Sequence, residues 1–474
     1  MKHFLLMLGV TIFTSIVATA VPFWGVMLYY GFATLRPQSL WAWALAEAPQ
    51  VRWSLTAMLI AMVATLVNLP TILETFRSNK VLTLLCLYAV LMLMSMLTAF
   101  DPATSWFWAQ EYGKVFVMFF IATLVIQRFW QVRAMLVMVV LCLGYIAYHF
   151  NFMYFFQGQR LDIFHVGFGG LDNNGAGQLL ALGIPFAYFL ATSPAGNWSN
   201  TRRVVGVVIA LLLMHTVMMT YSRGAMLAAA LGIVWLLIHH RPRLQSGILA
   251  AGLVIAISVM AGQEIRDRAA STAEFQTDES AQSRFDSWAA AWEIVWEHPV
   301  LGKGIRNSND YSQNFGADRA GRTIHNQYLQ IAADSGIPAL AAYLAMLGIG
   351  IYGLSRARRR CLNAEYFFNH NEPDPEGPHD QRGLVDRARD AGQLCLALQT
   401  GLLMFCFSSM FLSVELVELP WLLIAMSGIL PMAVDRRLEG LGYQAEDQQR
   451  PRVYTPPPIH HAPKAKPAPT RKAA

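Results

Sequence analysis

The stretch VVGVVIALLLMHTVMMTYSRGAMLAAALGIVWLLI, residues 204–238, decides the class of fold. It consists of two apolar runs, 204–221 and 224–238, and Arg223 stands between them with no room for a solvated loop. Apolar runs of roughly 15 to 22 residues have the length of a helix that crosses a lipid bilayer. The stretch therefore predicts two membrane-spanning helices joined by a short turn.

Similar apolar runs fill most of the chain. In addition to the two just quoted, they lie at 4–30, 53–73, 81–99, 113–126, 132–150, 175–192, 245–262, 336–355, 393–413 and 419–434. Only 14% of the 474 residues are charged, where a soluble domain usually carries about a quarter. This composition excludes an ordinary cytosolic enzyme and predicts an all-α polytopic membrane protein with about twelve transmembrane helices.

The positive charges lie mostly in alternate connections between the runs. The net charge is +6, and basic clusters occur at 202–203, 239–243, 356–360, 436–437 and 464–472. The positive-inside rule places these segments in the cytoplasm, and twelve crossings then place the N- and C-termini there as well. No basic groove with an aromatic platform accompanies the charges, so nucleic acid is not an expected partner, whereas membrane lipids are.

The N-terminal run allows more than one interpretation. Residues 1–20 resemble a secretory signal that ends in an A-x-A cleavage site, but the apolar run continues beyond it, so an uncleaved anchor is the simpler interpretation. Pro22 leaves open whether residues 4–35 form one kinked span or two short ones. The five cysteines indicate neither a disulfide framework nor a metal cluster.

The topology predicts four regions. Residues 1–262 hold the first nine helices, 263–335 form a large helical periplasmic loop, and 336–434 hold the last three helices with a cytoplasmic loop at 356–392. The polar segment 361–389 and the basic tail 435–474 are rich in charge and proline, and we expect loose loops or disorder there. Long loops on a minimal membrane scaffold commonly carry function, so we expect functional residues in the large loop.

Two helices are predicted in the large loop. The first is capped by Ser283 and ends at Pro299, and its aromatic stripe suits a helix that lies in the membrane interface. That stripe consists of Phe285, Trp288, Trp292, Val295 and Trp296. The second helix is predicted over 323–334, with His325 in its first turn, and Pro338 restarts the chain as a membrane span.

Arg223 is the sharpest single feature. A charge at membrane depth is unfavourable unless it is paired or faces a wet cavity. One interpretation is an arginine that snorkels at a helix end. The other is an anion site, because a guanidinium facing the side opposite the cytoplasm suits the phosphate of a lipid-linked substrate.

The large loop holds two further candidates. Arg284 opens the aromatic helix, where a phosphate could meet both its guanidinium and the helix N-terminus; the alternative is a solvated surface arginine. His325 is the best candidate base there, with Asn326 beside it to orient the ring or the substrate. The alternative for His325 is a structural hydrogen-bonding residue, and His215 is expected to be a satisfied core residue.

Several other patterns carry weaker signals. Gly302-Lys303-Gly304 lacks the pattern of a nucleotide-binding loop. His460-His461 has no second ligand pair at metal spacing, so no metal site is predicted. Asp172-Asn173-Asn174-Gly175 is first of all a turn and helix cap, although the amides of Asn173 and Asn174 could also bind sugar hydroxyls.

The order of these motifs resembles the O-antigen ligase and polymerase family of bacterial membrane glycosyltransferases, in particular its O-glycosylation-ligase-like members. Tyr221-Ser222-Arg223-Gly224-Ala225 is similar to the family's signature at the mouth of a span. The family's large-loop pattern is similar to Arg284-Phe285 to Trp288, followed by His298-Pro299 and Gly302-Lys303-Gly304-Ile305. Its loop-exit motif resembles His325-Asn326-Gln327-Tyr328-Leu329-Gln330, followed by Ser335-Gly336-Ile337-Pro338. Its closing hairpin resembles Phe411-Leu412-Ser413 with Leu419-Pro420.

The resemblance implies a bacterial inner-membrane enzyme with a multi-span, GT-C-like glycosyltransferase architecture. Its donor would be a glycan on an undecaprenyl diphosphate carrier, and transfer at the periplasmic face would invert the anomeric centre and need no metal, nucleotide or other cofactor. By the resemblance, Arg223 and Arg284 would hold the diphosphate, and His325 would take the proton of the acceptor hydroxyl or orient that hydroxyl. Tyr221, Ser222, Asn326, Asn173 and Asn174 are further candidates for substrate binding.

The acceptor stays open. A ligase passes the glycan to lipid A core or to a protein hydroxyl, whereas an O-antigen or exopolysaccharide polymerase passes it to another carrier-linked glycan. The overall similarity favours the ligase. A transporter or flippase for the same lipid-linked glycan is the alternative from another class, although the chain lacks the internal repeat that transporters commonly have.

Overall fold

The computed structural model describes residues 2–159, 162–194, 199–239, 279–315, 323–370, 381–414 and 416–443. These residues are helical and form no strand apart from an isolated bridge between Phe168 and Leu171. Eight of the described helices are long and apolar enough to cross a membrane, and the bent pair α5 and α6 would make nine. The protein is therefore an all-α polytopic membrane protein, although the number of such helices is lower than the predicted twelve. The predicted span at 245–262 lies outside the described residues.

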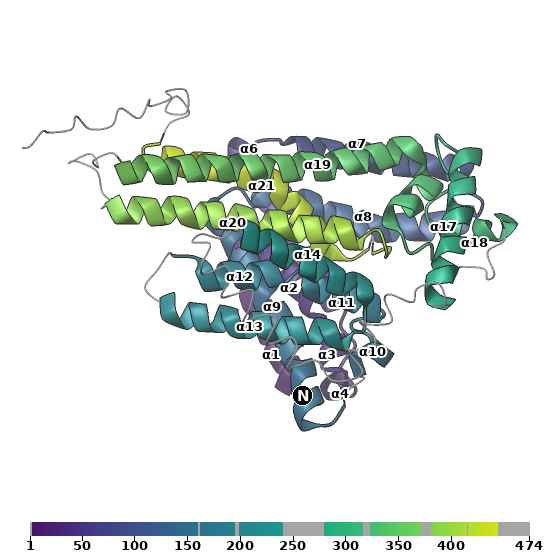
Figure 1. Ribbon diagram of the computed structural model, residues 1–474, viewed down its shortest axis with the longest axis horizontal. Coiled ribbons are helices and arrows are strands. Elements are labelled where there is room, and N and C mark those ends of the chain that lie inside the picture. Colours follow the sequence, from purple (N-terminus) through teal and green to yellow (C-terminus); the bar gives the residue numbers. More distant parts are fainter. Residues whose placement is uncertain are drawn as a thin grey trace, which may run out of the picture.

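Most predicted runs coincide with helices (Figure 1). These helices are α5 (Trp53–Val67) with α6 (Leu69–Thr75), α7 (Lys80–Met94) with the 3-10 helix η1 (Ser95–Thr98), α8 (Pro102–Val125), α9 (Phe129–Phe156), α11 (Asn173–Ala181) with α12 (Ile184–Thr192), α13 (Ser199–Met219), α14 (Arg223–His239), α19 (Gln327–His370), α20 (Gln381–Ser408) and α21 (Glu418–Glu439). Short helices in the connections are α3 (Pro37–Leu40), α4 (Ala42–Leu45), α10 (Asp162–Val166), α18 (Ser308–Tyr311) and η3 (Ser312–Phe315).

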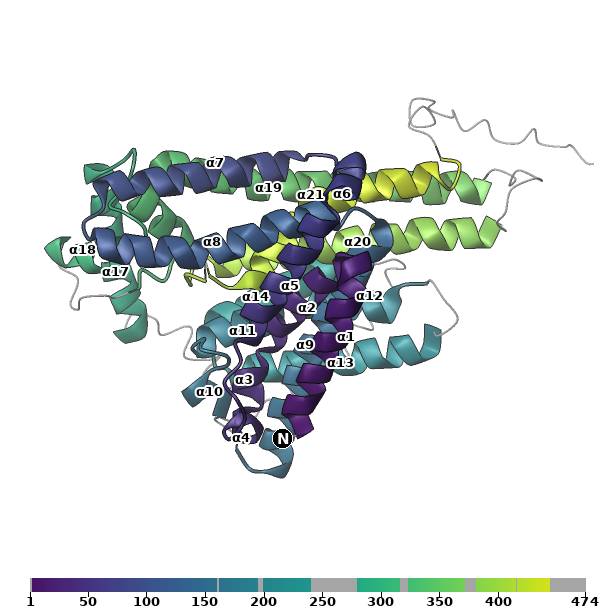
Figure 2. The same cartoon turned by 180° about the vertical axis from the view of Figure 1, so that it is seen from behind.

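The N-terminal run forms two antiparallel helices, α1 (Lys2–Ala20) and α2 (Phe23–Leu35). The rings of Phe4 and Phe32 both contact the ring of Trp53, with centroids 5.6 and 6.0 Å away. At the other end of this group, Asn68 donates its side-chain amide to the carbonyl of Thr19. Helix α1 therefore runs parallel to α5, and α2 returns antiparallel to both, as Figure 2 lets the reader follow.

This hairpin decides between the two interpretations that the sequence leaves open for residues 4–35, because two helices form instead of one kinked span. Lys2 and His3 line one cavity together with Trp43, which belongs to the connection between α2 and α5. The N-terminus therefore lies at the same end of the bundle as the connection between α2 and α5. The physical reason is Pro22, which lies where α1 ends and lets the chain reverse direction instead of continuing as one span.

A break divides α19 into the two predicted helices. Gly336 has φ 85° and ψ 168°, so the helix that begins at Gln327 ends here and the long helix restarts around Pro338. A β-carbon at Gly336 would lie 2.1 Å from the carbonyl oxygen of Val300, so no other residue fits without a shift of the backbone. The predicted start at residue 323 is wrong, because residues 323–326 precede the helix.

Helices α19 and α20 continue far beyond the predicted membrane spans, to His370 and from Gln381. Figure 1 shows both projecting beyond their neighbours. Ion pairs stabilise this extension: Arg389 lies 2.8 Å from Glu365, and Arg360 lies 2.7 Å from Asp435 of α21. The expected loose loop is therefore corrected to helix over 361–370 and 381–389, and α21 likewise extends the ordered chain to Glu439.

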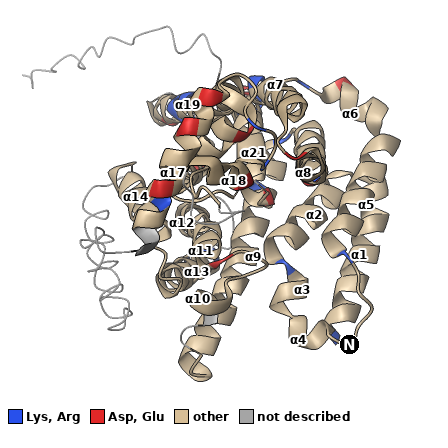
Figure 3. Ribbon diagram, turned by 90° about the vertical axis from the view of Figure 1, so that its right-hand side faces the viewer, with Lys and Arg blue, Asp and Glu red and all other residues tan. Residues whose placement is uncertain are grey.

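Helix α17 (Glu279–Glu297) lies across one end of the bundle, at a steep angle to α19 (Figure 1). It starts before the predicted cap at Ser283. Figure 3 looks onto this end and shows acidic residues, in red, along the ribbon of α17, whereas the helices of the bundle are mostly tan. The predicted aromatic stripe divides, because Val295 is buried whereas Trp292 and Trp296 are 50% and 64% exposed.

The large loop has a small core of its own, separate from that of the bundle. In it, α17 packs on the first part of α19 and on the chain just before it. Its buried members are Ala291, Ile294, Val295, Ile324, Ala332 and Ala333. This core fixes the position of α17, and therefore of Arg284, relative to the residues around His325.

Candidate functional site

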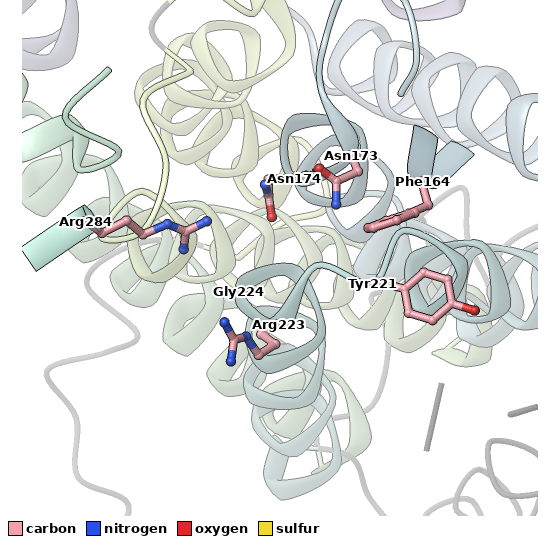
Figure 4. Close-up of a pocket in the computed structure, with 7 residues that line it drawn as sticks. All are labelled: Phe164, Asn173, Asn174, Tyr221, Arg223, Gly224 and Arg284. Atoms are coloured by element: carbon pink, nitrogen blue, oxygen red, sulfur yellow. Dashed lines mark hydrogen bonds between the residues drawn. The ribbon is translucent and has the colours of Figure 1, made fainter. Parts of the chain in front are cut away.

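A cavity of about 210 Å³ lies where α10, α11, α14 and α17 meet (Figure 4). It is lined by Phe164, Asn173, Asn174, Tyr221, Arg223, Gly224 and Arg284. The structure thus brings together five of the predicted site residues from three separate parts of the chain. Phe164 and Gly224 complete the lining; Phe164 stands in a segment without any sequence signal for a site.

Arg223 is held at the start of α14 by a tight turn. Helix α13 ends at Met219, and Tyr221 adopts a left-handed conformation with φ 52°. Ser222 then caps α14, because its hydroxyl accepts a hydrogen bond from the backbone N–H of Ala225 at 3.4 Å. Ser222 is 3% exposed and does not line the cavity, so its role is structural and differs from the predicted substrate contact.

The start of α11 forms the opposite wall of the cavity. Asp172 caps this helix by accepting from the backbone N–H of Gly175 at 2.8 Å. Asn173 donates its amide to the carbonyl of Thr220 at 2.9 Å. A β-carbon at Gly177 would lie 2.7 Å from the Thr220 hydroxyl oxygen, so only glycine lets α11 approach the turn this closely.

The electrostatics of the cavity favour an anion. The N-termini of α11 and α14 both lie at its wall, and a helix N-terminus carries a partial positive charge of about half an elementary charge. In Figure 4 the guanidinium groups of Arg223 and Arg284 face the same open space. Among the described residues that line the cavity, none carries a carboxylate. Guanidinium groups and helix N-termini together form a common arrangement for binding phosphate.

His325 and Asn326 lie just before α19 and are not among the residues that line the cavity. The prediction that His325 sits in the first turn of a helix is therefore wrong; it has a left-handed φ of 54°. Asn326 caps α19, since its side-chain oxygen Oδ1 accepts from the backbone N–H groups of Tyr328 and Leu329 at 3.0 and 3.1 Å.

The residues on either side hold His325 in place. The indole of Trp288 on α17 donates to the carbonyl of Ile324 at 2.9 Å. The backbone N–H of Gln327 donates to the carbonyl of Ser409, at the end of α20, also at 2.9 Å. His325 therefore stands between the helix that carries Arg284 and the end of α20.

A buried carboxylate that the sequence did not single out supports this part of the chain. Asp334 accepts from the backbone N–H and the hydroxyl of Ser308, at 3.0 and 2.6 Å, and from the amide of Gln330 at 2.8 Å. The backbone N–H of Gly304 donates to its carbonyl. The Gly302-Lys303-Gly304 segment is thus a structural turn against α19.

His215 is a core residue, as expected, although only its Nδ1 has a hydrogen-bond partner among the described residues. Its ring is fully buried, its Nδ1 lies 2.7 Å from the side-chain oxygen of Asn151, and it packs on Tyr154 and Phe155.

The family model of the O-antigen ligases matches residues 206–344. This match covers less than half of the chain and supports an assignment to the O-antigen ligase family. That family suggests an enzyme of the glycosyltransferase type, with a lipid-linked glycan and an acceptor as its general substrates. The matched residues include Tyr221, Arg223, Arg284 and His325, whereas Asn173 and Asn174 lie outside them. The comparison with curated proteins finds no match.

Proposed function

We propose that this protein transfers a glycan from an undecaprenyl diphosphate carrier to an acceptor hydroxyl at the periplasmic face, as an O-antigen ligase or O-glycosylation ligase. The observation that carries the proposal is the cavity in which Arg223 and Arg284 meet the N-termini of α11 and α14. A diphosphate carries negative charge in both the substrate and the leaving group. The cavity supplies compensating positive charge without a metal ion.

The proposed chemistry is a single displacement. The acceptor oxygen attacks the anomeric carbon from the face opposite the diphosphate, so that the new C–O bond forms as the bond to the phosphate oxygen breaks and the anomeric centre inverts. Arg223 and Arg284 take up the charge that develops on the leaving diphosphate. His325 accepts the proton of the acceptor hydroxyl. Neither a nucleotide nor a metal takes part.

His325 lies outside the lining of the cavity, and in the proposed arrangement this leaves room for the acceptor between His325 and the donor. The carrier diphosphate occupies the cavity, and the acceptor enters between it and the segment 324–327. Binding of the donor and removal of the acceptor proton are then carried by different groups on different elements. Loss of one should leave the other in place.

The test uses purified protein in lipid discs, with carrier-linked glycan, candidate acceptors, a chelator and no nucleotide. The mass of the acceptor is the readout. Gain of one glycan by lipid A core or by a protein supports the ligase. Growth of the carrier-linked glycan itself would identify the polymerase. Movement of the donor across a vesicle membrane, with no acceptor of changed mass, would identify a transporter.

A further inference from the structure

The turn at the end of α20, Ser408 to Phe411, contacts every element that carries a proposed site residue. On the donor side, Gln178 of α11 donates its amide to the hydroxyl of Ser408. On the acceptor side, the carbonyl of Ser409 accepts from the backbone N–H of Gln327, two residues after His325. We call this segment the α20 turn.

Phe411 joins the two arginine-bearing helices to this turn. A β-carbon added to Gly224, beside Arg223, would lie 3.5 Å from the β-carbon of Phe411, so the phenylalanine stands against the start of α14. Its ring centroid lies 6.4 Å from that of Trp288 on α17, one helical turn after Arg284. The same Trp288 indole holds Ile324, the residue before His325. Phe411 therefore stands between the supports of both arginines and of the histidine.

The two serines of the α20 turn are buried together with their hydrogen-bond partners. Ser408 is 4% exposed, Ser409 is 0%, and their partners Gln178 and Gln327 are 3% and 1% exposed. A buried hydrogen bond that loses one partner leaves a desolvated group behind, which disfavours rearrangement. Gln327 is held further by its amide, which donates to the hydroxyl of Tyr343 at 2.6 Å.

We propose that the α20 turn is the positioning device of the transfer reaction and that Phe411, Ser408 and Gln178 are positioning residues for it. They set where His325 stands relative to Arg223 and Arg284, and hence how the acceptor meets the anomeric carbon. None of them lines the cavity. This inference rests on the proposed function, because only a transfer reaction requires a fixed distance between the donor site and the base.

The first test is Phe411→Ala, with kcat and the KM values for donor and acceptor measured in lipid discs. A misplacement of about 1 Å can lower a rate ~100-fold, so we expect kcat to fall roughly 10- to 100-fold. The donor KM should stay within about threefold, since both arginines remain. Phe411→Tyr, which keeps the ring, should restore most of kcat. Phe107→Ala, which removes a 55% exposed ring, is the matched control and should leave kcat unchanged.

The second test is a double-mutant cycle of Gln178→Leu and Ser408→Ala, for use also if Phe411→Ala does not fold. If both residues act through their shared hydrogen bond, the double variant should lose no more kcat than the worse single variant. Multiplied losses would overturn the assignment for this pair. A folded Phe411→Ala protein with unchanged kcat, or with only a raised donor KM, would overturn the proposal for the turn. Absence of transfer by the parent protein to any acceptor would remove the proposed function and this inference with it.

Discussion

Asn173 donates its side-chain amide to the backbone carbonyl of Thr220, 2.9 Å away, and so joins the start of α11 to the turn that presents Arg223. The sequence indicates that Asp172-Asn173-Asn174-Gly175 is first of all a turn and helix cap, and that the Asn173 amide could also bind sugar hydroxyls. In the structure it supports the arginine, although Asn173 also lines the cavity. The hydrogen bond explains how an arginine at the end of an apolar run keeps one position beside the N-terminus of a second helix.

Removal of this hydrogen bond should weaken donor binding. A typical hydrogen bond contributes about 0.5 to 1.5 kcal/mol. Asn173→Ala should therefore weaken donor binding roughly two- to tenfold, because it releases the turn before Arg223. Binding of carrier-linked glycan to protein in lipid discs is the measurement. Asn200→Ala, at an exposed position near the start of α13, serves as the control. Equal binding by Asn173→Ala and the parent would show that the turn holds Arg223 without this contact.

The arginines should not tolerate lysine. Arg223→Lys keeps the charge but loses the planar pair of donors that meets two phosphate oxygens at once. We expect a loss of about 1 to 3 kcal/mol, seen as roughly tenfold to a hundredfold slower transfer. Arg284→Lys should behave in the same way. Full activity of Arg223→Ala at normal protein levels would instead identify Arg223 as a snorkelling residue.

The N-terminal hairpin predicts which side of the membrane Lys2 faces. In a chain whose five cysteines are replaced, Lys2→Cys and Ala44→Cys should react alike with an impermeant thiol reagent added outside the inner membrane. Arg359→Cys should react only after the membrane is opened. Protection of Lys2→Cys together with labelling of Ala44→Cys would rule out the antiparallel arrangement of α1 and α2.

Gly336 should be needed for the break in α19. Its φ of 85° is unfavourable for other residues, and a β-carbon there would meet the carbonyl of Val300. Gly336→Ala should lower stability by ~1 to 3 kcal/mol, measured as a lower midpoint of thermal unfolding in detergent. Gly348→Ala is the matched control in the same helix, because no atom lies within 4 Å of its added β-carbon. A control that lost as much stability as Gly336→Ala would contradict the strain argument.

The sequence predicted the parts of the fold and site that depend on composition. A charge between two apolar runs identified Arg223, and a glycine before a proline identified the break at Gly336. The hairpin at Pro22 was left open because hydropathy is the same for a kinked span and for two short helices. The contacts of Phe4 and Phe32 with Trp53 decide it, and they are not local in sequence.

Other features escaped prediction for related reasons. The extensions of α19 and α20 were expected to be loose because they are polar, yet ion pairs such as Arg389 with Glu365 support them as helices. The roles of Asn173 and Asn326 depend on which backbone groups lie nearby, and the residue type alone does not give this. The α20 turn carries no charged residue, and its proposed role depends on the elements that pack against it, which are far apart in the sequence.

The most direct test of the central claim follows the mass of the acceptor after incubation with carrier-linked glycan, for the parent protein and for His325→Ala. The parent should add one glycan to the acceptor with chelator present and nucleotide absent. His325→Ala should bind the donor normally but transfer it ~10²- to 10⁴-fold more slowly, as expected for loss of a general base. Transfer by His325→Ala at the parent rate would contradict the assignment of the base. An unchanged acceptor mass with the parent protein, together with movement of the donor across the bilayer, would contradict the glycosyltransferase itself.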